Sequence, residues 1–203
     1  MLHSESTNHL QSQGGEPKGF VGYIIGKLMN LFHITGYMLA LSKLPVADNL
    51  ICLDIGCGGG KLVNLLASQI KNGKIYGLDH SEQMVKLARK VNNSFIENGI
   101  VEILQGTVSA LPFSDSQFDL ITAFETIHFW PDLDTNLKEI PRKLKSSGKF
   151  MIVNRFPQEG TKWFNFVQIK NADEYKNKLV SAGFSDISVD IESKKGWIIV
   201  LAQ

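Results

Sequence analysis

The stretch from Leu50 to Lys61, L-I-C-L-D-I-G-C-G-G-G-K, constrains the fold of this chain more than any other. An apolar run of strand length ends at Ile55, and glycines follow at alternate positions, Gly56, Gly58 and Gly60. Glycine lets the backbone turn sharply and lie close to a ligand, because no Cβ stands in the way. Apolar residues then recur at helical spacing, at Leu62, Leu66 and Ile70. A buried strand, a glycine turn and a helix predict the first βα unit of a nucleotide-binding α/β fold.

The spacing of these glycines indicates which cofactor the turn suits. A dinucleotide-binding turn reads G-x-G-x-x-G, and its third glycine would fall on Lys61, which has a long charged side chain. The glycines here read G-x-G-x-G and are preceded by Asp54. This pattern resembles motif I, D-x-G-x-G-x-G, of the class I S-adenosylmethionine-dependent methyltransferases. The resemblance implies a site for S-adenosylmethionine, and for its product S-adenosylhomocysteine, at Asp54, Gly56, Cys57, Gly58 and Gly60. The alternative is a tight βα turn without a chemical role.

Asp79 ends the second predicted strand, 25 residues after Asp54. The carboxyl edge of an α/β sheet is where ligands bind, and a carboxylate there can accept hydrogen bonds from both hydroxyls of a ribose. An acid at this position serves nicotinamide enzymes and methyltransferases alike, so Asp79 favours a ribose without choosing the cofactor. A surface aspartate in a turn is the simpler alternative. The predicted cofactor site extends to His80 and Met84, which follow directly.

Gly106 to Phe113, G-T-V-S-A-L-P-F, resembles the family segment G-D-A-x-x-L-P-F. The aspartate of that segment contacts the adenine amino group in many members, and Thr107 takes its place here. A threonine hydroxyl can accept a hydrogen bond but carries no charge. The backbone of Val108 offers a second contact for the adenine. Phe124, at the end of the fourth predicted strand, completes the predicted cofactor residues.

Phe124 to Asp132, F-E-T-I-H-F-W-P-D, resembles the family branch with an L-H-H-V-P-D-like run after the fourth strand. The chain has no [DNS]-P-P-[YFW] motif there, which disfavours methylation of exocyclic amines on DNA bases. His128 matches the first histidine of the run and is the predicted general base, because an imidazole titrates near neutral pH. A structural histidine packed beside Trp130 explains the same residue equally well.

Strand and helix patterns alternate along the chain. Strands are predicted at 50–55, 74–79, 100–105, 118–124 and 149–154, and an antiparallel hairpin at 185–191 and 196–202. Helices are predicted at 18–32, 35–44, from Ser81 to Gly99, from Asp132 onward with Pro141 causing a bend or an early end, and from Asn171 to Gly183. The resemblance implies a class I methyltransferase sandwich: a mostly parallel seven-stranded α/β sheet with a C-terminal antiparallel hairpin and helices on both faces. We expect a flexible tail over 1–17 and one domain over 18–203, whose residues 18–45 form cap helices.

The composition limits the partners of the chain. A formal net charge of +1 over 203 residues gives no general attraction to nucleic acid. Polar residues at Lys27, Asn30 and His33 interrupt the most apolar segment, which argues against a membrane span. No secretory signal or cysteine–histidine metal pattern is visible, so we expect a cytoplasmic protein with reduced thiols and no metal. The oligomeric state stays open.

The sequence therefore predicts an S-adenosylmethionine-dependent methyltransferase, most similar to small-molecule enzymes of the ubiquinone/menaquinone-biosynthesis-like branch. A nicotinamide-dependent oxidoreductase and an S-adenosylmethionine-binding regulatory protein without turnover are the two alternatives. Two groups of residues either line the substrate pocket or pack within the fold. They are Tyr23, Asn30 and His33 near the N-terminus, and Trp163, Phe164 and Phe166 after the fifth strand.

Overall fold

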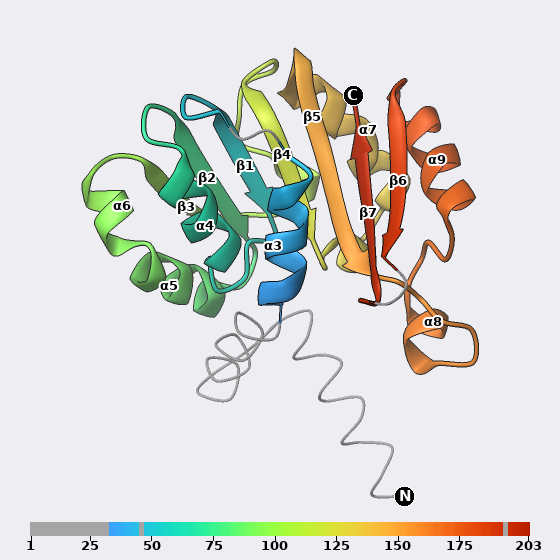
Figure 1. Cartoon of the computed structure of the whole chain (residues 1–203). Helices are drawn as coiled ribbons and strands as arrows, with labels where there is room; N and C mark the ends of the chain where they lie inside the picture. Colours follow the sequence, from blue (N-terminus) through green and yellow to red (C-terminus); the bar gives the residue numbers. More distant parts are fainter. Residues whose placement is uncertain (1–32, 45–46, 193–194) are drawn as a thin grey trace, which may run out of the picture.

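A computed structural model of the chain describes residues 33–44, 47–192 and 195–203. Its central element is a seven-stranded sheet in the order β3-β2-β1-β4-β5-β7-β6 (Figure 1). The strands are β1 (Ile51–Ile55), β2 (Lys74–Asp79), β3 (Val101–Gln105), β4 (Phe118–Phe124), β5 (Leu144–Arg155), β6 (Ile187–Glu192) and β7 (Trp197–Ala202). Six strands run in one direction, and β7 is antiparallel to its neighbours β5 and β6. The predicted class I methyltransferase sheet with its closing hairpin is confirmed.

Helices cover both faces of the sheet (Figure 1). On one face lie α3 (Ile34–Ser42), α4 (Lys61–Gln69) and α5 (Glu82–Val91), and on the other α7 (Leu133–Lys143) and α9 (Ala172–Ser181). Each face has its own apolar core, so the strands between them are buried on both sides. Shorter helices connect these elements: α6 (Asn93–Glu97), α8 (Lys162–Phe166), η1 (Val108–Ala110) and η2 (Ile127–Phe129).

The single helix predicted from Ser81 to Gly99 is wrong, because the helix breaks at Asn92 into α5 and α6. The Asn92 side chain is fully buried and donates hydrogen bonds to the carbonyl oxygens of Ala88 (2.9 Å) and Gly60 (3.0 Å). A buried amide needs such partners, and satisfying them fixes the end of α5 against the start of α4. Ser81 caps α5 as predicted, accepting a hydrogen bond from the backbone N–H of Met84.

The fifth strand begins at Leu144, earlier than the predicted start at Lys149. Helix α7 ends at Lys143, two residues after Pro141, which agrees with the early end expected from a proline in a helix. Leu144 then pairs with Phe118, and the register of β4 against β5 shifts before the regular pairing begins at Lys149. The irregular start of β5 is thus the consequence of a helix that runs directly into a strand.

Several predictions concern residues outside the described ranges: the tail over 1–17 and the helix over 18–32, with Tyr23 and Asn30 in it. Within the part of the chain that the structure describes, no helix has the length and apolar character needed to cross a membrane.

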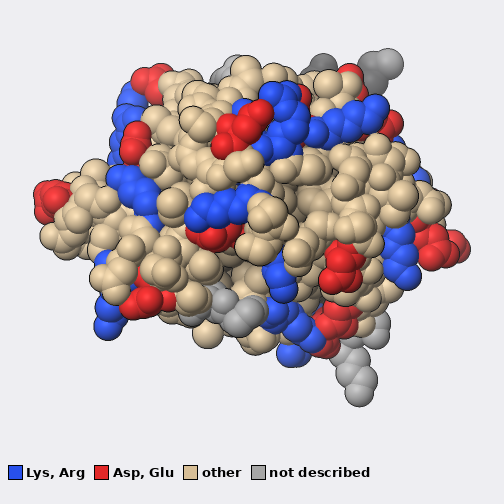
Figure 2. Space-filling model, turned by 90° about the horizontal axis from the view of Figure 1, so that it is seen from above, with Lys and Arg blue, Asp and Glu red and all other residues tan. Residues whose placement is uncertain are grey.

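The two edges of the sheet differ in what they can bind. Figure 2 views the edge at which the parallel strands begin, and basic and acidic side chains are interspersed there. Ion pairs at this edge join Lys143 to Asp115 (2.8 Å) and Lys145 to Asp119 (2.7 Å). The opposite edge, at the lower end of the sheet in Figure 1, carries the carboxyl ends of the strands, where α/β folds bind ligands.

Candidate active site

The glycine turn after β1 has the conformation that its sequence predicts. Gly56, Gly58 and Gly60 all have positive φ angles, of 72°, 51° and 76°, which L-residues with a side chain rarely adopt. The backbone N–H groups of Gly56 and Cys57 both donate to the carbonyl oxygen of Leu78, at 2.7 and 3.0 Å. These bonds hold the turn against the end of β2.

The three glycines are needed for different reasons. A Cβ on Gly56 would lie 2.1 Å from the Thr126 hydroxyl oxygen, and a Cβ on Gly60 would lie 2.8 Å from Ala88. A Cβ on Gly58 would meet nothing within 4 Å, so this glycine alone borders open space. Gly56 therefore allows the turn to contact the end of β4, and Gly60 allows α4 and α5 to pack closely. Gly60 does not line the cavity described next, although the sequence predicted it as a cofactor residue.

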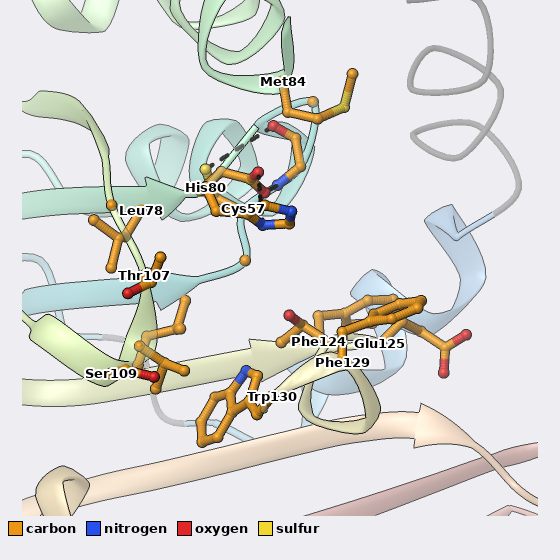
Figure 3. Close-up of a pocket in the computed structure, with 18 of the residues that line it drawn as sticks. Cys57, Leu78, His80, Met84, Thr107, Ser109, Phe124, Glu125, Phe129 and Trp130 are labelled. Carbon is orange, nitrogen blue, oxygen red and sulfur yellow. Dashed lines mark hydrogen bonds and ion pairs between the residues drawn. The ribbon is translucent and has the colours of Figure 1, made fainter. Parts of the chain in front are cut away.

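A cavity of about 350 Å³ opens at the carboxyl edge, beside this turn (Figure 3). Of the eleven predicted cofactor residues, all but Asp54 and Gly60 line it. The nine are Gly56, Cys57, Gly58, Asp79, His80, Met84, Thr107, Val108 and Phe124. The lining residues that the sequence analysis did not assign to the cofactor include Ser109, Glu125, Thr126, Phe129, Trp130 and Pro131, together with His33 and Tyr37 of the α3 region.

Asp79 connects β2 to the glycine turn. One carboxylate oxygen accepts from the backbone N–H of Gly58 (2.8 Å) and the other from that of Ser81 (2.9 Å). Burial raises the pKa of Asp79, while these two hydrogen bonds and the neighbouring His80 lower it. Each carboxylate oxygen has a further lone pair, so Asp79 keeps the capacity to accept hydrogen bonds from a ribose diol.

Asp54 lies behind the turn, outside the lining of the cavity. Its side chain is buried, and the Thr122 hydroxyl donates to one carboxylate oxygen at 2.7 Å. Burial raises the pKa of Asp54 to about 7, although the Thr122 hydrogen bond opposes the shift. The Asp54 carboxylate thus joins β1 to β4 through its hydrogen bond with Thr122 and does not line the cavity.

His128 has the position of a structural histidine. It lies in η2, is 8% exposed, and its ring centroid is 4.2 Å from that of Phe129 and 4.7 Å from that of Trp163. Burial lowers the pKa of His128 to about 3, and within the described residues its Nδ1 atom has no hydrogen-bond partner. The cavity is lined by the next two residues, Phe129 and Trp130, and not by His128. His128 therefore lies outside the lining of the cavity, and its role as a general base stays a prediction.

The aromatic residues after β5 pack on His128. Trp163 and Phe166 belong to α8, and both lie within ring contact of His128, at centroid distances of 4.7 and 5.6 Å. Phe166 also contacts Phe129, whose other side faces the cavity. Of the two roles considered for these aromatic residues, the packing role is the one that their positions support.

The region of α3 closes one side of the cavity with aromatic rings. Tyr37 packs on Phe124 at a centroid distance of 4.3 Å, and His33 lies 5.5 Å from the same ring. Gly36 permits this contact, because a Cβ there would lie 2.7 Å from both Phe124 and Trp197. Burial lowers the pKa of His33 to about 4, so its imidazole is neutral at physiological pH. His33 is the one described member of the predicted N-terminal group, and it does line the cavity.

The comparisons with known proteins agree with this geometry. The family model described as "Methyltransferase domain" matches residues 53–152. A demethylmenaquinone methyltransferase of Lactobacillus johnsonii is 37% identical over 113 residues, covering 55% of this chain and 46% of the relative. The enzyme of the same name from Bacillus licheniformis is 30% identical over 151 residues, covering 73% and 64%. The first of these matches spans about half the length of its relative.

Solved structures share the fold. A SAM-dependent methyltransferase from Aquifex aeolicus aligns with a TM-score of 0.71 at 24% identity, covering 82% of this chain and 88% of that one. The [4+2]-cyclase SpnF aligns with a TM-score of 0.70 at 19% identity, covering 83% and 80%. These two activities show that the fold by itself does not fix the reaction.

The sheet order, the glycine turn and the cavity at the carboxyl edge are those of the class I methyltransferase fold. Residues 53–152 match a methyltransferase domain, the relatives include demethylmenaquinone methyltransferases, and these matches indicate S-adenosylmethionine as the cofactor. The residues fit this cofactor, because Gly58 borders open space beside the Asp79 carboxylate. The nicotinamide alternative is not favoured, since Lys61 begins α4 where a dinucleotide turn takes glycine.

Proposed function

We propose that the protein transfers the methyl group of S-adenosylmethionine to a small, largely apolar acceptor of the quinone-like class, by in-line displacement at the sulfonium methyl. The observation that carries the proposal is the division of the cavity into two parts. Backbone and polar groups gather around the glycine turn, Asp79 and Thr107, and aromatic rings gather around Phe124 and Phe129. The names of the demethylmenaquinone methyltransferase relatives support an aromatic acceptor.

The cofactor supplies a methyl group that is already activated by the sulfonium charge. The task of the protein is then to hold the two reactants in line, which can account for much of the rate. In the proposed arrangement, Asp79 accepts the ribose hydroxyls, and Thr107 with Val108 faces the adenine. The rings of Tyr37, Phe124 and Phe129 hold the acceptor and keep water away from the reacting atoms. The buried free thiols of Cys52 and Cys57 support a cytoplasmic location.

Calorimetry and a turnover assay test this function. Titration with S-adenosylhomocysteine should show saturable binding, and NADH should show none. Formation of S-adenosylhomocysteine should then be followed with a panel of hydroxylated naphthoquinols, phenols, amines and thiols, and the naphthoquinols or phenols should be methylated fastest. The absence of any binding of S-adenosylmethionine or S-adenosylhomocysteine at millimolar concentration would contradict the proposal. Binding without turnover of any acceptor would favour the regulatory alternative.

A further inference from the structure

Glu125 is a buried carboxylate on the cavity that the cofactor contacts proposed above do not use. It follows β4 directly, and its φ angle of 54° is unusual for a residue with a side chain. Its backbone N–H donates to the carbonyl oxygen of Val153 at 2.8 Å, which holds this conformation. The side chain is 9% exposed and lines the cavity. Strained backbone at a ligand-binding edge often belongs to a functional residue.

The position of Glu125 corresponds to one end of the bound cofactor. Figure 3 shows Thr107 and Ser109 at one side of the cavity and the carboxylate of Glu125 beyond Phe124 and Phe129 on the other. With the adenine at Thr107 and the ribose at Asp79, the amino-acid end of the cofactor extends toward the glycine turn. A Cβ on Gly56 in that turn would lie 2.1 Å from the hydroxyl oxygen of Thr126, the residue after Glu125. The chain at Glu125 therefore passes beside the turn that the amino-acid end would reach.

The charges around the cavity point to a cation at this end. The described lining residues include two carboxylates, Asp79 and Glu125, and neither lysine nor arginine. Asp79 already accepts a backbone hydrogen bond at each oxygen. One oxygen of Glu125 accepts from the backbone N–H of Arg155, and the other lies 3.7 Å from Arg155 Nε, beyond hydrogen-bond distance. The Arg155 side chain is half-exposed, so it compensates the buried charge only in part.

We propose that Glu125 binds the α-ammonium group of S-adenosylmethionine and fixes the amino-acid end of the cofactor between the glycine turn and α3. This inference rests on the proposed function. A buried carboxylate without a full partner is costly, and an ammonium group is the partner that would make a charge-assisted hydrogen bond with it.

The ionisation of Glu125 makes the proposal testable by pH. Burial raises the pKa of Glu125 to about 7, against the opposing effect of the Arg155 backbone N–H and guanidinium. Among the described residues, the charge of Glu125 also helps to raise the pKa values of Tyr37 from α3 and Tyr175 from α9, and Asp54 acts on Tyr37 in the same direction. An ammonium group binds the carboxylate and not the neutral acid. Affinity for a ligand with this group should therefore rise with pH through about 7.

The first experiment compares two ligands on Glu125→Gln. S-adenosylhomocysteine has the amino-acid end, and 5′-methylthioadenosine lacks it but keeps the adenine and ribose. The substitution should weaken the binding of S-adenosylhomocysteine by about 10- to 100-fold, because one charge-assisted hydrogen bond is lost. It should change the affinity for 5′-methylthioadenosine less than about twofold. Asp79→Asn is the matched control, because it should weaken both ligands. The inference would be overturned if Glu125→Gln changed the affinities for both ligands equally, or changed neither. It would also be overturned if the variant lost turnover but kept the parent's affinity for S-adenosylhomocysteine.

The second experiment needs no variant and remains valid if Glu125→Gln does not fold. In the unmodified protein, S-adenosylhomocysteine should bind about eightfold more tightly at pH 7.5 than at pH 6, from the ionised fractions of an acid with a pKa of about 7. The affinity of 5′-methylthioadenosine should stay constant over the same range, and a pH dependence shared by the two ligands would overturn the inference. If neither ligand binds the unmodified protein, the proposed function itself fails. If both ligands bind but their affinities depend on pH in the same way, the assignment of Glu125 fails and the proposed function stands.

Discussion

Replacing His128 by leucine should change how the stability of the protein depends on pH, in favour of the folded state at acid pH. The His128 ring is buried, and burial lowers its pKa from 6.5 to about 3. In the unfolded chain the imidazole takes up a proton below about pH 6.5, whereas in the folded protein it stays neutral down to about pH 3. The unfolded state then binds more protons, so the contribution of His128 to stability is lost as pH falls below 6.5. At pH 5 the loss is about 2 kcal/mol, since one pKa unit corresponds to about 1.4 kcal/mol.

Only a difference between two proteins isolates this contribution. Burial raises the pKa values of Asp54 and Glu125 to about 7, so the folded state binds more protons at these groups than the unfolded state does. They stabilise the fold as pH falls from 7 toward their unfolded values and oppose the effect of His128. Urea unfolding at pH 7 and pH 5 should be measured for the parent and for His128→Leu. The change in unfolding free energy between the two pH values should be about 2 kcal/mol more favourable in the variant.

A control accompanies this measurement. S-adenosylhomocysteine affinity should be unchanged in His128→Leu, because His128 does not line the cavity. An identical pH dependence in the parent and His128→Leu would refute the reasoning, since it would show that His128 is protonated in the folded state as easily as in the unfolded chain.

Two further predictions concern the cofactor side of the cavity. Gly58→Val should abolish S-adenosylhomocysteine binding in calorimetry, because the side chain would enter the open space beside the turn and would not suit the φ angle of 51°. Unchanged affinity would mean that the cofactor does not lie on this turn. Asp79→Ala should weaken binding more than Thr107→Ala, since charge-assisted hydrogen bonds are worth about 1.5–3 kcal/mol each and a neutral one about 1 kcal/mol. Equal losses from the two variants would contradict the ribose and adenine assignments.

The strands could be predicted because each rule they depend on is local. Apolar runs bounded by glycine, asparagine and aspartate mark the strands, and the alternation with helices implies a parallel sheet. The break at Asn92 could not be predicted in this way. The residue fits a continuous helical pattern, and only its contact with Gly60, 32 residues earlier in the chain, explains why the helix ends there. Tertiary hydrogen bonds of this kind leave no periodic signal in the sequence.

The candidate site was predictable where one short motif makes one local structure. The glycine turn and Asp79 are such cases, because a turn and a strand end fix where the backbone and the carboxylate lie. The run from Thr126 to Trp130 is not. Its residues form a 3₁₀ turn, in which neighbours point about 120° apart, so a change of one position moves a side chain to another face. His128 is buried against Trp163 of α8, whereas Phe129 lines the cavity.

Glu125 could have been found by a different criterion. Three acids end neighbouring strands at this edge, Asp54 near the end of β1, Asp79 at the end of β2 and Glu125 just after β4, and burial raises the pKa of each. A core selected for stability alone would not contain them, because each ionised group costs folding free energy whenever the pH exceeds its folded pKa. For Asp54 and Glu125 this cost amounts to several kcal/mol together above pH 7. Asp54 is stabilised by the Thr122 hydroxyl behind the turn, whereas Asp79 and Glu125 line the cavity, where a ligand with cationic groups would offset the cost when it binds. Buried acids that follow neighbouring strands and line a cavity therefore indicate a site for a positively charged ligand.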